Sequence, residues 1–167
     1  MKPFPAPSDM LLADAAALNA AVGDLVRVYQ FRDRDRICCY DVSVTQCYAL
    51  EMLAETGPLR SQQLADRLML DKSTTTRVVD ALVRKGYVER RADAEDARAL
   101  ALTITATGRA LYNKINDGLV AQQAELLRDL DPAIRQGVTE VVRRLATAAA
   151  ARFVAGVSVG ACAPALE

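Results

Sequence analysis

Hydrophobic side chains near the start of the chain recur at spacings of three and four residues. This period places them on one stripe of a long helix, because an α-helix has about 3.6 residues per turn. Ser8 precedes the pattern and is expected to cap the helix. The stripe fits either a long core helix or a helix that packs partly against a second subunit, and we favour the second. Its members are Leu11, Ala15, Leu18, Val22, Leu25 and Tyr29.

A run of alternating Arg and Asp at 32–36 is expected to end that helix. Ser43 and Gln46 then have the spacing of a capping box, in which each side chain bonds to the backbone N–H of the other residue. A second helix is therefore predicted from Ser43 to about Glu55, where Gly57-Pro58 closes it.

Two closely spaced helices are predicted next. The first spans about 61–68, and the second spans 72–85, with Asp71 as its N-cap and Gly86 after its last turn. Their inward-facing side chains are expected to be Leu64, Leu68, Thr75, Val78, Val79 and Leu82.

The segment 87–104 changes from a helical to an alternating period. Leu100, Leu102 and Ile104 alternate with other residues in its second half, which is typical of a strand. We therefore predict a β-hairpin with a charged tip. Two more helices are expected after it, at 105–130 and at 132–153.

A short helix, a tight turn, a second helix and a hairpin form, in this order, the pattern of a winged helix-turn-helix. The second helix of this motif needs short hydrogen-bonding side chains near its N-terminus, so that its backbone can approach the major groove of DNA. It also needs an Arg that reaches a phosphate or a guanine edge. Residues of these types are Lys72, Ser73, Thr74, Thr76 and Arg77.

The hairpin tip adds Arg90, Arg91 and Arg98, which could follow a phosphate backbone or place one guanidinium in the minor groove. Asp96 could hold the Arg98 side chain by an ion pair. Each residue alone has a plainer interpretation, because Ser and Thr in a first turn often only cap a helix and an exposed Arg often only solubilises. The ordered combination favours DNA binding.

Composition narrows the class of protein. The chain has 167 residues, 51% of them hydrophobic, with 21 Lys and Arg against 21 Asp and Glu, which suits one compact domain and excludes a uniformly basic nucleic-acid binder. Positive charge is in local excess at 59–104, with 9 basic and 7 acidic side chains. The absence of His excludes imidazole metal sites and His-based catalysis within the chain. We expect a cytoplasmic protein with no membrane partner, because no apolar stretch is long enough for a signal peptide or a bilayer span.

In the order of its motifs, the segment Val44 to Leu111 resembles the winged-helix core of the MarR family of bacterial transcription factors. The resemblance implies a homodimer whose first and last helices interlock, a palindromic double-stranded DNA operator, and repression relieved by a ligand or by thiol chemistry. The matching motifs are Thr45-Gln46, Leu53-Ala54-Glu55, Gly57-Pro58-Leu59, Leu64 to Leu68, Asp71 to Leu82, Gly86 to Arg90, Asp93 to Arg98, and Leu102 to Arg109.

Two positions depart from the pattern of the family. Ala97 stands where the family often has Arg, and Thr75 replaces a usual apolar core residue. The minor-groove contact would then fall to Arg98.

Pattern and resemblance together predict a mainly α fold with a small β-hairpin wing, a winged helix-turn-helix dimerised through its N- and C-terminal helices. The winged helix-turn-helix lobe is expected at 43–104, and the helical dimerisation region at 8–42 and 105–153. A C-terminal tail follows at 154–167, and coordination by Cys162 could order it.

The cysteines suggest how the protein is regulated, because thiols in a cytoplasmic chain are more often ligands or redox groups than a disulfide framework. Cys38 and Cys39 precede the second helix, and Cys47 lies in its first turn, where backbone N–H groups stabilise a thiolate. Three thiolates suit a soft ion such as arsenic(III), antimony(III) or copper(I). Zinc or an iron–sulfur cluster needs a fourth ligand, and Cys162 is the one cysteine left.

Other interpretations of this region stay open. The cysteines could be buried packing residues, or they could sense oxidants. Tyr29, Tyr40 and Tyr48 could line a pocket for a small aromatic inducer between the dimer helices and the lobe. A thiol oxidoreductase lacks support, since there is no Cys-x-x-Cys pair, no nucleotide-binding glycine motif and no His base, so we expect no enzyme. A winged helix that only binds other proteins is a further class.

Overall fold

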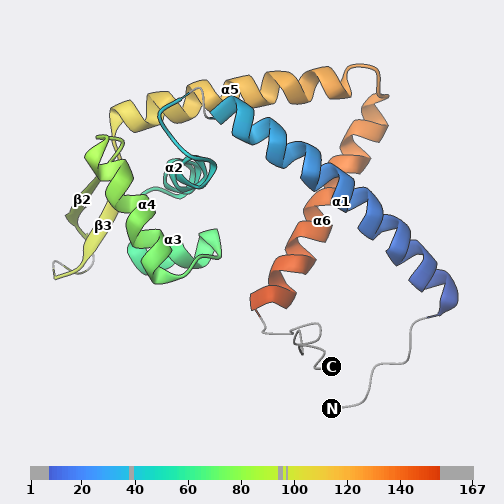
Figure 1. The fold of residues 1–167 in the computed structure, drawn as a ribbon, viewed down its shortest axis with the longest axis horizontal. Coiled ribbons are helices and arrows are strands. Elements are labelled where there is room, and N and C mark those ends of the chain that lie inside the picture. Colours follow the sequence, from blue (N-terminus) through green and yellow to red (C-terminus); the bar gives the residue numbers. More distant parts are fainter. Residues whose placement is uncertain (1–7, 38–39, 94–95, 97, 155–167) are drawn as a thin grey trace, which may run out of the picture. The chain divides into compact units, whose positions relative to one another are not determined.

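The computed structural model describes residues 8–37, 40–93, 96 and 98–154. Its elements occur in the predicted order, with a three-stranded sheet inserted among six helices in the described ranges (Figure 1). The chain divides into two compact units, and the boundary along the sequence lies between Asp117 and Gly118, inside the fifth helix. The elements are α1 (Asp9–Ile37), α2 (Val44–Thr56), β1 (Leu59–Arg60), α3 (Ser61–Leu68), α4 (Lys72–Arg84), β2 (Val88–Ala92), β3 (Leu100–Ile104), α5 (Ala106–Leu127) and α6 (Pro132–Val154).

The core of the first unit lies among α2, α3, α4 and the sheet, which confirms the expected mainly α, winged helix-turn-helix fold. The capping box at Ser43 and Gln46 starts α2, with Ser43 N donating to Gln46 Oε1 at 3.1 Å and Gln46 N donating to Ser43 Oγ at 3.2 Å. Inward-facing leucines from each helix are fully buried. These are Leu50, Leu53, Leu64 and Leu82.

The sheet has three antiparallel strands in the order β1-β3-β2, so the prediction of a two-stranded hairpin was incomplete. The additional strand β1 pairs Leu59 with Leu102 and Arg60 with Ala101. Two residues are too few to show an alternating pattern, and this is why the sequence did not reveal the strand. Gly57, with φ of 82°, directs the chain from α2 into it.

Register assigns each side chain of the wing to one face of the sheet, since paired residues on neighbouring strands point to the same side. Leu59, Leu102 and Val88 are buried against the helices. Arg60, Ala101 and Arg91 are paired across the three strands on the opposite, outer face. Apart from Arg90, which is paired with Leu102, the inner face of the wing is apolar, and its outer face carries Arg60 and Arg91 in ion pairs with Asp93 and Glu89.

The α1 helix ends at Ile37, directly after the charged run at 32–36, which confirms the prediction that this run ends it. Ser8 caps α1 as expected, because Leu11 N donates to Ser8 Oγ at 3.3 Å. Ile37 is only 1% exposed and anchors the end of α1 in the core.

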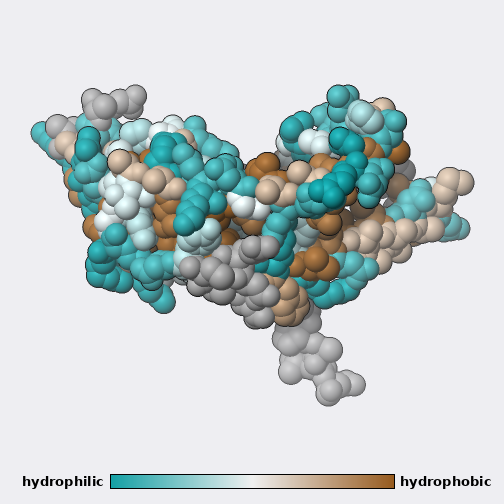
Figure 2. Space-filling model, turned by 90° about the horizontal axis from the view of Figure 1, so that it is seen from above, coloured by the Kyte–Doolittle hydropathy of each residue, from teal (hydrophilic) through white to brown (hydrophobic). Residues whose placement is uncertain are grey.

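The predicted apolar stripe of α1 is exposed over most of its length. Leu11 is 56% exposed, Leu18 45%, Val22 44% and Leu25 50%, which rules out a long core helix within one chain. Figure 2 shows hydrophobic residues in brown at the surface of the long helices. On α5 and α6 the exposed apolar residues include Val120, Leu126, Ile134, Val138, Val141, Val142 and Leu145. Within the described residues, no helix combines the length and hydropathy needed to cross a bilayer.

Candidate nucleic-acid interface

The N-terminus of α4 is built around the carboxylate of Asp71. This carboxylate accepts hydrogen bonds from Thr74 N at 2.9 Å and from the hydroxyls of Ser73 and Thr74, each at 2.6 Å. These hydrogen bonds, first from Ser73 and then from Thr74, hold the pKa of Asp71 well below its ordinary value. Ser73 and Thr74 therefore serve the cap, and their hydroxyl oxygens keep lone pairs for other donors.

Thr75 is a polar residue in the core of the lobe, and its hydroxyl has a hydrogen-bond partner there. It is fully buried, as predicted, and its hydroxyl donates to the carbonyl oxygen of Asp71 at 3.0 Å. Because this bond satisfies the hydroxyl, the methyl group can pack among apolar side chains at little cost. The departure from the apolar family pattern at this position is thus locally compensated.

The exposed face of the first two turns of α4 carries Lys72, Thr76 and Arg77. Arg77 Nη2 donates to Ser73 Oγ at 3.5 Å, and Thr76 Oγ1 donates to the carbonyl oxygen of Lys72 at 2.8 Å. Residues three and four apart share one side of a helix, so Ser73, Thr76 and Arg77 lie together. This face offers a guanidinium, an ammonium and hydroxyls, the set predicted for the major groove of DNA.

Arg90 and Arg91 lie on β2, and the expectation that they belong to the hairpin tip was wrong, because β2 extends to Ala92. Arg90 reaches α4, where Nη2 pairs with Asp80 Oδ1 at 2.5 Å. Arg91 lies on the outer face and pairs with Glu89 at 2.6 Å. Arg90 therefore links the wing to α4.

The tip of the wing is a turn held by two carboxylates. Asp96 N donates to Asp93 Oδ1 at 3.1 Å, and Arg98 N donates to Asp96 Oδ1 at 3.0 Å. Asp96 thus contacts the backbone of Arg98, in place of the ion pair expected with its side chain. Ala99 closes the turn through Asp93 N to Ala99 O at 3.0 Å. Arg98 is exposed, and Ala97 lies outside the described residues.

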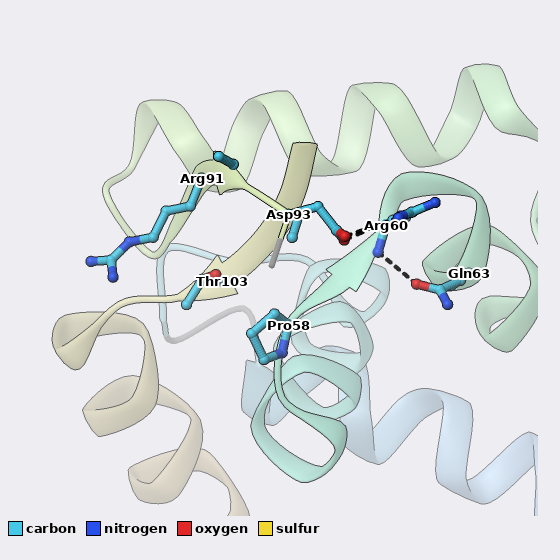
Figure 3. Close-up of a pocket in the computed structure, with 8 residues that line it drawn as sticks. Pro58, Arg60, Gln63, Arg91, Asp93 and Thr103 are labelled. Atoms are coloured by element: carbon cyan, nitrogen blue, oxygen red, sulfur yellow. Dashed lines mark hydrogen bonds and ion pairs between the residues drawn. The ribbon is translucent and has the colours of Figure 1, made fainter. Parts of the chain in front are cut away.

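One ion pair at the wing was not predicted. Arg60 donates to Asp93 twice, from Nε to Oδ2 at 3.1 Å and from Nη2 to Oδ1 at 2.9 Å, and Figure 3 shows the two side chains facing each other. The Asp93 side chain is only 14% exposed. The two residues are 33 positions apart and Arg60 lies on the unpredicted strand β1, so no local sequence signal could pair them.

The cysteine cluster is represented by one residue, since Cys38, Cys39 and Cys162 lie outside the described residues. Cys47 lies on α2 and is 5% exposed. Burial, followed by the neighbouring Glu51, Glu55 and Cys47, raises the pKa of Tyr112 on α5 above its ordinary value. Within the described part of the chain, no three His, Cys, Asp or Glu side chains come together as a metal site would require.

The three tyrosines considered for an aromatic ligand have different surroundings. Tyr29 carries the guanidinium of Arg32 at 3.9 Å from its ring centre, and Tyr40 has Lys114 Nζ at 5.6 Å. Tyr48 is 44% exposed on α2. The aromatic-ligand site stays a prediction.

Comparison with known proteins gives a consistent result. Residues 42–100 match the model of the MarR family. YkoM of Bacillus subtilis, named an uncharacterized HTH-type transcriptional regulator, is 35% identical over 71 residues, or 42% of this chain and 46% of that protein, so the chain spans less than half of this relative. The organic hydroperoxide resistance transcriptional regulator of the same species is 28% identical over 100 residues, covering 56% of this chain and 68% of that protein.

A solved structure supports the fold independently of these sequences. The structure of a MarR family protein from Bacillus stearothermophilus superimposes with a TM-score of 0.72 over 85% of this chain and 97% of that chain. The identity is 22%, so this likeness concerns the fold alone.

Proposed function

We propose that the chain is a MarR-family winged helix-turn-helix regulator that represses transcription by binding a palindromic double-stranded DNA operator as a homodimer. The family consists of DNA-binding regulators and not of enzymes, which excludes a thiol oxidoreductase. The observation that carries the proposal is the exposed N-terminal face of α4, with Lys72, Thr76 and Arg77 on one side of the helix. The wing is tied to this same helix by Arg90.

In the proposed complex, α4 enters the major groove with its N-terminal turns first. Arg77 then reaches a guanine edge or a phosphate, and Lys72 contacts the backbone as a point charge. Arg98, exposed at the tip of the wing, enters the adjacent minor groove, where the negative potential attracts a guanidinium.

The second subunit is inferred from the apolar residues that one chain leaves exposed. A row of exposed apolar side chains along one helix face marks an interaction face. Leu18, Val22 and Leu25 form such a row along α1, and α5 and α6 have exposed apolar residues of their own. A two-fold dimer would place two α4 helices one turn of DNA apart, about 34–36 Å, on a palindrome.

The test of DNA binding uses fluorescence anisotropy with a fragment from the promoter of the gene itself. Arg77→Ala is expected to weaken binding about tenfold to a hundredfold, by the loss of one guanidinium contact. Arg128→Ala is the matched control, because this exposed Arg pairs with Glu125 outside the winged-helix lobe. Equal affinities for the parent and Arg77→Ala would overturn the proposed interface and favour a protein-interaction module.

For the inducer, we propose a soft ion held by thiolates of Cys38, Cys39 and Cys47, with arsenic(III) or antimony(III) in trigonal geometry. Copper(I) is a further soft ion that these thiolates could hold. Zinc or an iron–sulfur cluster would need a fourth ligand, and Cys162 of either subunit is the candidate. The position of Cys47 within the first turn and a half of α2 supports the proposal. Since Cys47 is 5% exposed, the ion would be enclosed within the lobe.

Two other inducers are alternatives at the same region. The named relative that regulates organic hydroperoxide resistance favours an oxidant acting on the thiols. A small aromatic ligand near Tyr29, Tyr40 and Tyr48 is the other alternative.

Anaerobic anisotropy with reduced protein separates these inducers. Arsenite, antimonite, zinc and copper(I) are each titrated into the protein–DNA complex, followed by cumene hydroperoxide and salicylate. Release by one ion at near-stoichiometric amounts, reversed by a dithiol and absent in Cys47→Ser, is the expected result. Cys47→Ala controls for packing, and both variants must bind DNA like the parent. A Cys47→Ser protein that still responds would exclude the thiol mechanism.

A further inference from the structure

We propose that Arg60 is a positioning residue for the wing, which orients Arg98 for DNA through Asp93 without contacting DNA itself. This inference rests on the proposed function, because it concerns how the same DNA-binding surface is assembled. It is carried by a continuous series of hydrogen bonds from the start of α3 to the tip of the wing.

The first part of the series fixes Arg60. Its backbone pairs with Ala101 in the sheet, and its N–H donates to Gln63 Oε1 in the first turn of α3 at 2.8 Å (Figure 3). The guanidinium then holds Asp93 by two parallel bonds, an arrangement that fixes direction as well as distance. Asp93 is thereby tied to the helix-turn-helix as well as to its own hairpin.

The second part transmits this position to Arg98. The Asp93 oxygen that accepts from Arg60 Nη2 also accepts from Asp96 N, and the Asp96 carboxylate accepts from Arg98 N. Asp96 O accepts from Ala99 N at 2.8 Å, which tightens the same turn. Loss of Arg60 would remove two of the hydrogen bonds that hold the Asp93 carboxylate and would loosen its hold on Asp96 N. The wing turn would then sample more conformations, and Arg98 would bind DNA at a larger entropic cost.

The faces of the sheet argue against a direct contact of Arg60 with the DNA that α4 would bind. Arg90 points to the inner face and reaches Asp80 on α4. Arg91, the next residue, points to the outer face, and register places Ala101 and Arg60 on that outer face too. Arg60 therefore extends from the side of the sheet that faces away from α4.

The surroundings of Arg60 make it suitable for substitution. Its side chain is 41% exposed and borders an open pocket of about 550 Å³ on the outer face. Pro58, Gln63, Arg91 and Thr103 also line this pocket (Figure 3). A shorter side chain at position 60 would leave space that water already enters, so we expect no collapse of the core.

A double-mutant cycle tests the proposal with Arg60→Gln, Arg98→Ala and the variant that combines them, each titrated against promoter DNA. Arg60→Gln is expected to weaken binding about threefold to tenfold in the parent and to have almost no effect in the Arg98→Ala background. Asp93→Asn should give a similar loss and should add little to Arg60→Gln. Arg128→Gln, which removes an exposed Arg paired with Glu125, is the matched control and should bind like the parent.

Each outcome decides a separate point. An equal loss of DNA affinity from Arg60→Gln in both backgrounds would mean that Arg60 contacts DNA directly. No loss of affinity in the parent would mean that the hydrogen bonds of Arg60 do not position Arg98. Either result overturns the inference. Arg77→Ala, measured alongside, tests the proposed function itself. Unchanged DNA binding by this variant would mean that α4 does not contact DNA. Circular dichroism verifies folding. If Arg60→Gln unfolds, Arg60→Lys carries the same comparison, since it keeps the charge and loses the parallel bonds.

Discussion

The winged-helix lobe and the long helices differ in where they keep their apolar residues. In the lobe, Leu53 and Leu82 are fully buried, and the exposed positions of α4 are polar or charged. On α1 and α5, Leu11 is 56% and Leu126 is 64% exposed. The lobe therefore contains its own core, whereas the long helices expose apolar faces that a second chain would cover.

The lobe should depend on its own core for stability. Leu53→Ala removes a side chain with 0% exposure and should lower the free energy of unfolding by about 2–5 kcal/mol, because the site cannot fully close around the cavity. Urea denaturation followed by circular dichroism measures this loss. Leu100→Ala, 58% exposed on β3 of the same lobe, should cost less than about 1 kcal/mol. Similar costs at both positions would contradict the assignment of the core.

The long helices should depend on a second chain. Leu18→Asp places a carboxylate in the proposed interface and should weaken dimerisation about a hundredfold or more, with a parallel loss of operator affinity. Sedimentation equilibrium measures the dimer directly. Ala20→Asp is the control, because Ala20 lies on the same side of α1 as the charged residues Asp24 and Arg27. A Leu18→Asp protein that stays dimeric would remove the α1 stripe from the interface.

The N-cap of α4 should make the lobe sensitive to acid. Since the pKa of Asp71 lies below its ordinary value in the folded state, its contribution to stability is complete above the unfolded value of 3.8 and is lost as the pH falls toward the lower folded pKa. Asp71→Ala should therefore be less stable than the parent at pH 6, and this difference should shrink near pH 3. A difference that does not change between these two pH values in urea denaturation would contradict the role of the carboxylate.

The smallest effect is expected at Glu51 on α2. Burial, and then the neighbouring Glu55, raise the pKa of Glu51 above its ordinary value of 4.5. A carboxylate whose pKa is raised in the folded state destabilises that state at pH values above the unfolded pKa. At pH values below the unfolded pKa it has no such effect. Glu51→Gln should slightly raise the melting temperature at pH 7 and leave it unchanged near pH 3.5. A lower melting temperature at pH 7 would show that the Glu51 carboxylate has a favourable partner.

Local patterns were sufficient to predict most of the lobe from the sequence. The Ser43–Gln46 capping box, the Asp71 cap and the inward position of Thr75 each depend on residues within one helical turn, and all are confirmed. The exposed stripe of α1 was also identified, and only the structure decided that one chain leaves it uncovered.

Contacts between distant residues could not be predicted in the same way. Strand β1 has two residues and forms only because β3 provides a partner. The pairs Arg60–Asp93 and Arg90–Asp80 join elements whose register was unknown beforehand. These pairs change the description of the wing. Arg90 and Arg91 are exposed but engaged in ion pairs with Asp80 and Glu89, and Arg98 is the arginine at the tip, on a turn held by Asp93 and Asp96.

In the proposed complex, two copies of this chain bind one palindromic DNA site through their α4 helices. Sedimentation of the protein with a fluorescent promoter fragment over a range of salt concentrations, with a scrambled fragment of equal length beside it, tests this complex. We expect two chains per promoter duplex, affinity that falls steeply with salt, and at least about a thousandfold weaker binding to the scrambled fragment. Equal affinity for both fragments, or one chain per duplex, would rule out the proposed complex.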